Sequence, residues 1–128
     1  MKVLTLKQPW ATLVAENLKQ YEFRTWKTNY RGEILIHAGI GIDKEAMEKV
    51  KHLNLTFPSK RIIAKATIID CIELTDEINK QISKENELIY GNKKRTGYAF
   101  KLDKIQKLNI DEEIKGQLGL WNYDIEEE

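Results

Sequence analysis

The sequence predicts an α+β fold, a closed or nearly closed mixed β-barrel of about six strands with two to three peripheral helices. Short segments that alternate polar and apolar residues recur along the chain, and only a few helical patterns interrupt them. The strand–helix–strand rhythm of a parallel α/β sheet is missing. The length of 128 residues fits one domain, residues 1–128, with one hydrophobic core.

The first predicted elements are a strand and a helix. Lys2–Leu6 alternates polar and apolar residues, which indicates a strand. Pro9 suits the first turn of a helix because the N–H that it lacks would be unpaired there. Apolar residues at helical spacing extend this helix to about Glu16. The helix should end at Asn17, because asparagine tolerates the left-handed conformation of a helix C-cap.

Two strands are expected next. Gln20–Trp26 alternates, and this pattern places Glu22 and Arg24 on the same face of the strand. Glu33–Ala38 is a second alternating segment, which the glycines at positions 39 and 41 should end.

The middle of the chain predicts a helix, a long strand and a second helix. Asp43 is a candidate N-cap for a helix that runs to about His52. Arg61–Glu73 is the longest β-like segment, and a strand of this length is expected to bend, as strands do at a barrel corner. Thr75–Tyr90 is polar and helix-prone.

The last part of the chain favours short strands. Tyr98–Leu102 alternates, Lys107–Ile110 can add a short strand, and Gly116–Tyr123 resembles a final strand entered through a glycine. Glu126–Glu128 is expected to be a solvated tail.

The charge of the chain is balanced overall and uneven locally. The net charge of +1 argues against a protein that coats nucleic acid by bulk electrostatics. Residues 92–107 nevertheless hold six basic side chains against one acid, and residues 111–128 hold seven acids against one lysine. A cleft between the two regions can still attract phosphate.

The sequence also indicates a cellular compartment. The single cysteine, Cys71, excludes an internal disulfide and a multi-cysteine metal site, and two distant histidines add no recognisable metal ligands. No stretch approaches the roughly 20 apolar residues of a membrane span, and the N-terminus is too short and polar for a signal peptide. We therefore expect a cytoplasmic protein without membrane association, metal or cofactor.

A set of short motifs covers the first forty residues. They read Gln8-Pro9-Trp10-Ala11, then Asn17-Leu18-Lys19-Gln20-Tyr21-Glu22-Phe23-Arg24, then Arg31-Gly32 and His37-Ala38. This pattern resembles the ASCH domain family (activating signal cointegrator homology), which is PUA-like in fold. The chain departs from the family at Asn17, where glycine is usual, and the C-cap argument explains the exchange.

The resemblance implies a PUA-like barrel with one polar cleft lined by Lys19, Glu22 and Arg24. Arg24 offers a rigid fork for a phosphate, a carboxylate or a base edge, and Glu22 can read an amino group on a base. Lys19 supplies a mobile positive charge. Spacing alone also allows a plain surface ion pair between Glu22 and Arg24, worth about 0–1 kcal/mol.

Further candidates for binding surround this motif. Trp26 and Tyr98 can stack on a base, and Gln8 lies at a helix start, where backbone N–H groups favour anions. Four basic side chains are candidate phosphate contacts. They are Arg31, Lys93, Lys94 and Arg95.

Three functions stay open at this point. The first is a module that binds RNA or a nucleotide-like ligand. The second is an amidohydrolase acting on an acylated nucleoside such as N4-acetylcytidine, as in one bacterial branch of the family. Glu22 stands where that branch has threonine. In this chain Glu22 would therefore act as general base and Lys19 would stabilise the oxyanion. The third is a coregulator-type module with a protein partner.

Overall fold

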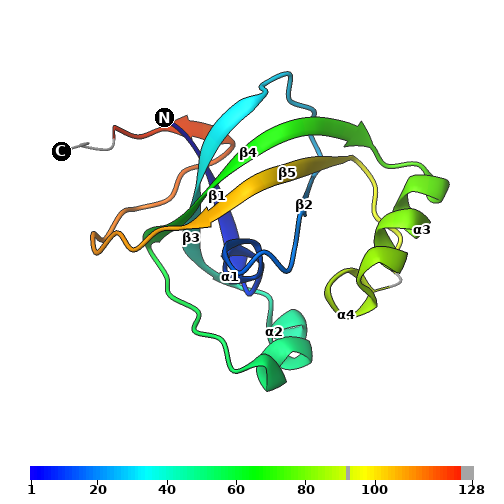
Figure 1. The fold of residues 1–128 in the computed structure, drawn as a ribbon, viewed down its shortest axis with the longest axis horizontal. Coiled ribbons are helices and arrows are strands. Elements are labelled where there is room, and N and C mark those ends of the chain that lie inside the picture. Colours follow the sequence, from blue (N-terminus) through cyan, green and yellow to red (C-terminus); the bar gives the residue numbers. More distant parts are fainter. Residues whose placement is uncertain (92, 125–128) are drawn as a thin grey trace.

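The computed structural model describes residues 1–91 and 93–124. Among them, six strands form one mixed sheet in the order β2-β5-β4-β3-β1-β6, shown in Figure 1. The strands are β1 (Lys2–Gln8), β2 (Tyr21–Arg24), β3 (Gly32–Ile42), β4 (Arg61–Glu73), β5 (Tyr98–Lys107) and β6 (Leu120–Asn122). The helices are α1 (Trp10–Ala15), α2 (Lys44–Val50), the 3-10 turn η1 (Lys51–Leu53), α3 (Asp76–Glu85) and α4 (Glu87–Tyr90). The predicted α+β fold is confirmed, whereas the single-domain assignment stays a prediction.

The sheet is not closed into a barrel, which corrects the expectation of closure. Its edge strands, β2 and β6, do not pair with each other. β1 pairs with β3 in parallel and with β6 over Lys2–Leu4 only, because β6 is three residues long. The sheet instead curves around α1 (Figure 1). A side chain bridges the opening, because Arg24 on β2 donates from Nη2 to the carbonyl oxygen of Thr5 on β1 at 2.8 Å.

Three apolar clusters hold the sheet and helices together. The largest lies inside the curve, where α1 packs on the inward side chains of four strands, among them Leu4, Ile36, Ala66 and Phe100. A second joins α1, α3 and α4 to the sheet through Tyr90 and its neighbours. A third lies on the outer face, where residues 108–114 pack against the sheet. Burial of this apolar area is the main force that orders the elements.

Several local predictions are confirmed. β4 spans the predicted Arg61–Glu73. Asn17 has a left-handed φ of 58° directly after α1, as a helix C-cap requires. Asp43 caps α2, because its side chain accepts a hydrogen bond from Ala46 N at 3.1 Å.

Other local predictions are wrong in an informative way. β3 continues through Gly39 and Gly41, because these glycines allow β1 to come close: a Cβ at Gly39 would lie 2.9 Å from Thr5 Cγ2. The predicted Lys107–Ile110 strand begins at the residue where β5 ends and is not a separate strand. The predicted helix over 75–90 is divided at Asn86, which caps α4. The tail at 126–128 lies outside the described residues.

Within residues 1–91 and 93–124, no helix is long and apolar enough to cross a membrane.

Candidate functional site

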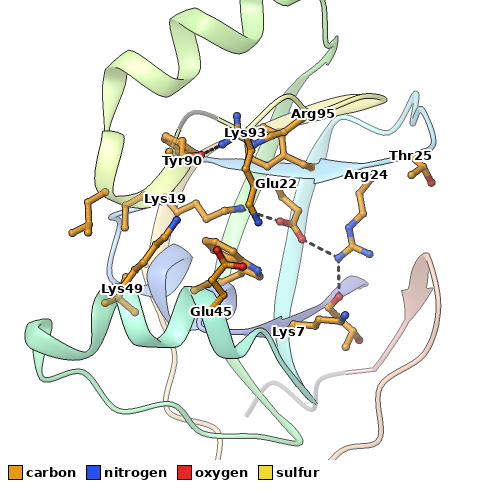
Figure 2. A pocket seen from close by; sticks show the side chains of 18 of the residues that line it. Lys7, Lys19, Glu22, Arg24, Thr25, Glu45, Lys49, Tyr90, Lys93 and Arg95 are labelled. Atoms are coloured by element: carbon orange, nitrogen blue, oxygen red, sulfur yellow. Dashed lines mark hydrogen bonds and ion pairs between the residues drawn. The ribbon is translucent and has the colours of Figure 1, made fainter.

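A pocket of about 500 Å³ lies between β2, α2 and the segment that follows α4. Figure 2 shows that side chains from these elements converge on it. Its charged lining residues are Lys7, Lys19, Glu22, Arg24, Glu45, Lys49, Lys93 and Arg95. Its aromatic lining residues are Trp10, Phe23, Trp26 and Tyr90. This size falls within the roughly 300–1,000 Å³ that is typical of small-molecule sites.

Three motif residues form a continuous ion-pair chain on one wall of the pocket. Lys19 Nζ donates to Glu22 Oε1 at 2.9 Å and also to the carbonyl oxygen of Tyr21. Arg24 Nη2 donates to Glu22 Oε2 at 3.0 Å. Both carboxylate oxygens of Glu22 are therefore occupied, as the dashed lines in Figure 2 show.

Burial makes this chain different from a surface ion pair. The side chain of Lys19 is 3% exposed and that of Glu22 is 10% exposed. Burial opposes ionisation of Glu22, but the Lys19 and Arg24 cations outweigh it and hold the pKa of this carboxyl below its usual value. Burial lowers the pKa of the Lys19 ammonium, and Glu22 offsets this effect only in part.

Local geometry explains how these side chains come together. The left-handed turn at Asn17 directs the chain from α1 back toward β2, which brings Lys19 against the start of that strand. On the other side of β2, Gly97 has a φ of +96° and lies so close that an added Cβ would be 2.4 Å from Arg24 O. Glycine is required there, because any side chain would push β5 away from the strand that carries Glu22 and Arg24.

Arg95 enters the pocket from the segment after α4. Its guanidinium carbon lies 4.4 Å from the centre of the Phe23 ring, a cation–π distance. Arg95 Nη1 donates to Asn79 Oδ1 at 2.8 Å, and Nη2 donates to the carbonyl oxygen of Tyr90. These contacts fix the guanidinium in the wall of the pocket without neutralising its charge.

The pocket carries an excess of positive charge. Six basic side chains and two carboxylates line it, although the whole chain has a net charge of only +1. Among the described residues, the structure records no ion pair for Lys7, Lys49, Lys93 or Arg95. The Nε atom of Arg24 is buried and has no hydrogen-bond partner in the part of the chain that is described. The site therefore offers free positive charge and one unused donor.

Most of the predicted site residues lie at this pocket. Lys19, Glu22 and Arg24 line it, together with Trp26, Lys93 and Arg95. Trp26 packs edge-on against Phe100, with ring centres 5.1 Å apart, and is half-buried.

Four predicted residues lie elsewhere, each for a local reason. Gln8 is 2% exposed and has its amide fully occupied within the fold, donating to Pro58 O at 2.9 Å and accepting from the Thr12 N–H. Arg31 donates to the carbonyl oxygens of residues 28 and 30. Lys94 is an exposed side chain 4.0 Å from an acid on α3, and Tyr98 packs against the inner cluster.

The prediction missed several lining residues. Lys7 lies on β1, and Lys49 and Glu45 lie on α2. Tyr90, at the end of α4, was missed as well, and its hydroxyl accepts a hydrogen bond from Gln20 N at 2.9 Å. Nothing local in the sequence joins α2 to the motif, since the two come together through tertiary packing, in which Val50 of α2 shares an apolar cluster with Tyr21 and Tyr90.

The described residues contain no group of three or more histidine, cysteine or acidic side chains that could hold a metal ion.

Comparison with known proteins adds family information. A family model described as the ASCH domain matches residues 4–110. The human protein named Activating signal cointegrator 1 is 25% identical over 129 residues, an alignment that covers 94% of this chain and 22% of that protein. The mouse protein of the same name is 24% identical with the same coverage. The chain thus spans about a fifth of the length of these curated relatives.

Proposed function

The chain belongs to the ASCH domain family, and we propose that it is a binding module whose pocket holds a nucleotide-like anion, either a free nucleotide or a stretch of RNA. The observation that carries this proposal is a set of cations around a pocket of about 500 Å³ that have no acid partner in the described part of the chain. A phosphate group is the complementary ligand for such a set.

The phosphate is expected near Lys49, Lys93 and Arg95. Arg95 is held by Asn79 and the Tyr90 carbonyl, so its fork is positioned before a ligand arrives. The two lysines supply mobile charges that enter the pocket from two elements, Lys49 from α2 and Lys93 from the segment after α4, as Figure 2 shows. Positioning before binding lowers the entropic cost of association.

The base is expected against the aromatic side of the pocket. Trp10 and Trp26 line it and are half-buried, so part of each ring remains available for stacking. The buried Arg24 Nε would gain an acceptor from a bound ligand. A nucleotide combines an aromatic ring with a phosphate, which matches both sides of the pocket.

The amidohydrolase alternative is less well supported by the geometry. A general base needs a free oxygen and a pKa near the working pH. Both oxygens of Glu22 are occupied by Lys19 and Arg24, and these cations hold its pKa below the usual value. Glu22 is better suited to organise the two cations than to accept a proton from water.

A protein partner is the other alternative, since the curated relatives are named as a signal cointegrator. The features of the pocket itself favour a small aromatic anion over a peptide, because its polar groups are mainly cations.

Two neighbouring lysines offer a matched test. Lys93 lines the pocket, whereas Lys94 is exposed, lies near Asp76 and is not among the lining residues. We expect Lys93→Gln to weaken binding of a fluorescent nucleotide or short RNA and to reduce the salt dependence by about one phosphate contact. Lys94→Gln should leave both nearly unchanged.

The outcome separates the alternatives. Equal effects of the two substitutions would show that binding is nonspecific electrostatic attraction and would contradict the proposal. The same protein incubated with N4-acetylcytidine should give no cytidine by chromatography. Turnover that is lost in Lys19→Ala, while circular dichroism shows that this variant is folded, would instead establish the hydrolase.

A further inference from the structure

A second hollow, larger than the pocket, lies on the outer face of the sheet. It has a volume of about 730 Å³ and is formed by β1, β3 and the connection 113–118. We refer to it as the outer groove. Its lining comes from segments that are distant in the sequence. It includes His37 of the His37-Ala38 motif and the charged side chains of Lys7, Lys60, Glu113 and Lys115.

The outer groove exposes apolar groups that a folded chain normally covers. The Leu118 side chain is 99% exposed and Ile40 is 71% exposed, and both line the groove. Its floor includes Gly39 and Gly41, over which β1 side chains lie: a Cβ added at Gly39 would be 2.9 Å from Thr5 Cγ2, and one at Gly41 would be 3.0 Å from Lys7 Cγ. The exposed aliphatic side chains of Ile40 and Leu118 offer apolar surface to one face of a ring.

The floor of the outer groove is rigid. His37 is fully buried beneath it, and its two ring nitrogens lie 3.2 Å from Thr5 Oγ1 and 2.6 Å from Ile114 O. The Trp121 indole N–H donates to the same Thr5 hydroxyl at 3.0 Å. The connection lies directly on this floor, because a Cβ added at Gly116 would be 2.9 Å from Thr5 Cγ2. The shape of the groove is therefore set before anything binds.

The outer groove adjoins the pocket across β1. Thr5 and Lys7 on β1 line both hollows, so a ligand can pass from one to the other across a single strand. Lys7 stands at the crossing, is exposed, and has no recorded ion pair among the described residues. Within the groove, Lys60 is paired with Glu113 at 3.2 Å, whereas Lys115 has no ion pair with any residue that the structure describes.

We infer that the ligand is a single-stranded nucleic acid of at least two units, which crosses β1 over Lys7 and places a second base in the outer groove. The inference rests on the proposed function of the pocket and extends it from one nucleotide to a strand. Lys7 lies between two hollows that each suit a base, which is where the phosphate that joins two nucleotides would lie. Charge complementarity with Lys7 and Lys115 favours this occupant over an uncharged apolar group.

The test compares ligand lengths in variants that change only the outer groove. Ile40→Glu adds a negative charge to its lining, and Ile42→Glu is the matched control, because Ile42 lies two residues along the same strand, is 58% exposed and does not line the groove. Both side chains are exposed, so both variants are expected to fold. Affinity for a nucleoside monophosphate and for a single-stranded trinucleotide would be measured by calorimetry at two salt concentrations.

We expect the trinucleotide to bind wild type at least tenfold more tightly than the mononucleotide. Its salt dependence should be steeper by about 0.7 for each added phosphate contact. Ile40→Glu should remove this gain and leave mononucleotide affinity unchanged, whereas Ile42→Glu should keep the gain.

Three results would overturn the inference. Mononucleotide binding with no gain from length would leave the proposed function intact and exclude the second unit. A gain that Ile40→Glu and Ile42→Glu reduce equally would place the additional contacts outside the outer groove. Absence of binding to either ligand would contradict the proposed function itself, and the inference with it.

Discussion

Replacing Glu22 by glutamine tests whether the ion-pair chain of the pocket is a buried structural element. The substitution keeps the shape of the side chain and removes the charge that Lys19 and Arg24 share. Arg24 is 22% exposed and can regain water, but the Lys19 side chain is 3% exposed and cannot do so without opening the fold. The variant therefore leaves a buried ammonium without a counter-charge.

The expected loss of stability follows from this geometry. Breaking a buried ion pair by removing one partner costs about 3–5 kcal/mol. The glutamine oxygen can still accept one hydrogen bond, so we expect the lower end, a fall of about 3 kcal/mol in the free energy of unfolding. An exposed pair would lose only about 0–1 kcal/mol. The two cases are readily separated, because typical domains have a total stability of about 5–15 kcal/mol.

The assay is urea denaturation followed by circular dichroism, with an unchanged m-value as the check that both proteins unfold in the same way. Glu16→Gln is the control, because Glu16 accepts from Lys107 at 2.6 Å in an exposed pair and should lose less than about 1 kcal/mol. The double variant Lys19→Met with Glu22→Gln should be more stable than Glu22→Gln alone, since it contains no unpaired ammonium. A loss for Glu22→Gln no greater than that for Glu16→Gln would refute the reasoning.

Three further predictions concern the fold around the pocket and the outer groove. Gln8→Ala leaves the buried Pro58 carbonyl and Thr12 N–H without their partner and should lower the free energy of unfolding by about 3 kcal/mol, measured by denaturation. Nucleotide affinity should be unchanged, and a selective loss of affinity would show that Gln8 is a binding residue. Gly97→Ala should destabilise the protein clearly more than Gly119→Ala, because both have positive φ but only Gly97 meets neighbouring atoms, and equal melting temperatures would contradict this. Burial lowers the pKa of His37 in the folded protein below the value of 6.5 that it has in the unfolded chain. As the pH falls below about 6.5, the unfolded chain therefore takes up a proton that the folded protein does not yet bind. The free energy of unfolding should decrease over this range, down to the folded-state pKa. An NMR titration in which the His37 ring protonates above pH 6.5 would exclude that contribution.

Local physical rules were enough to predict much of the fold. The structure has three of these features as predicted. Asn17 and Asp43 act on backbone within a few residues, and the long strand Arg61–Glu73 is indicated by its own β-like composition. Gly39 and Gly41 were assigned as strand breakers because the approach of β1 that makes glycine necessary there depends on the folded sheet. The open sheet has the same origin, since the length of β6 is set by pairing with β1 and not by its own alternation.

The sequence also predicted only part of the pocket, namely the residues that lie close together along the chain. The motif placed Lys19, Glu22 and Arg24 on one wall, because they lie close together in the sequence and on the same strand or next to it. The sequence predicted Arg95 only as part of a basic turn. Its position in the pocket wall depends on the Phe23 ring, which is distant in the sequence, and on the carbonyl group of Tyr90 at the end of α4. The position of Lys49 depends on how α2 packs under the sheet, which no local pattern specifies.

The motif and the surrounding cations therefore have separate tasks. Arg24 donates hydrogen bonds to Glu22 and to the carbonyl oxygen of Thr5, and the second bond bridges the open edge between β2 and β1. Glu22 in turn is occupied by Lys19 and Arg24, so the motif shapes one wall of the pocket and nearly balances its own charge. Free charge comes from Lys49 on α2 and from the segment after α4. It follows that substitutions in the motif should affect stability and pocket shape together. Substitutions of the exposed Lys49 and Lys93 should instead change which anion is bound and leave the fold intact.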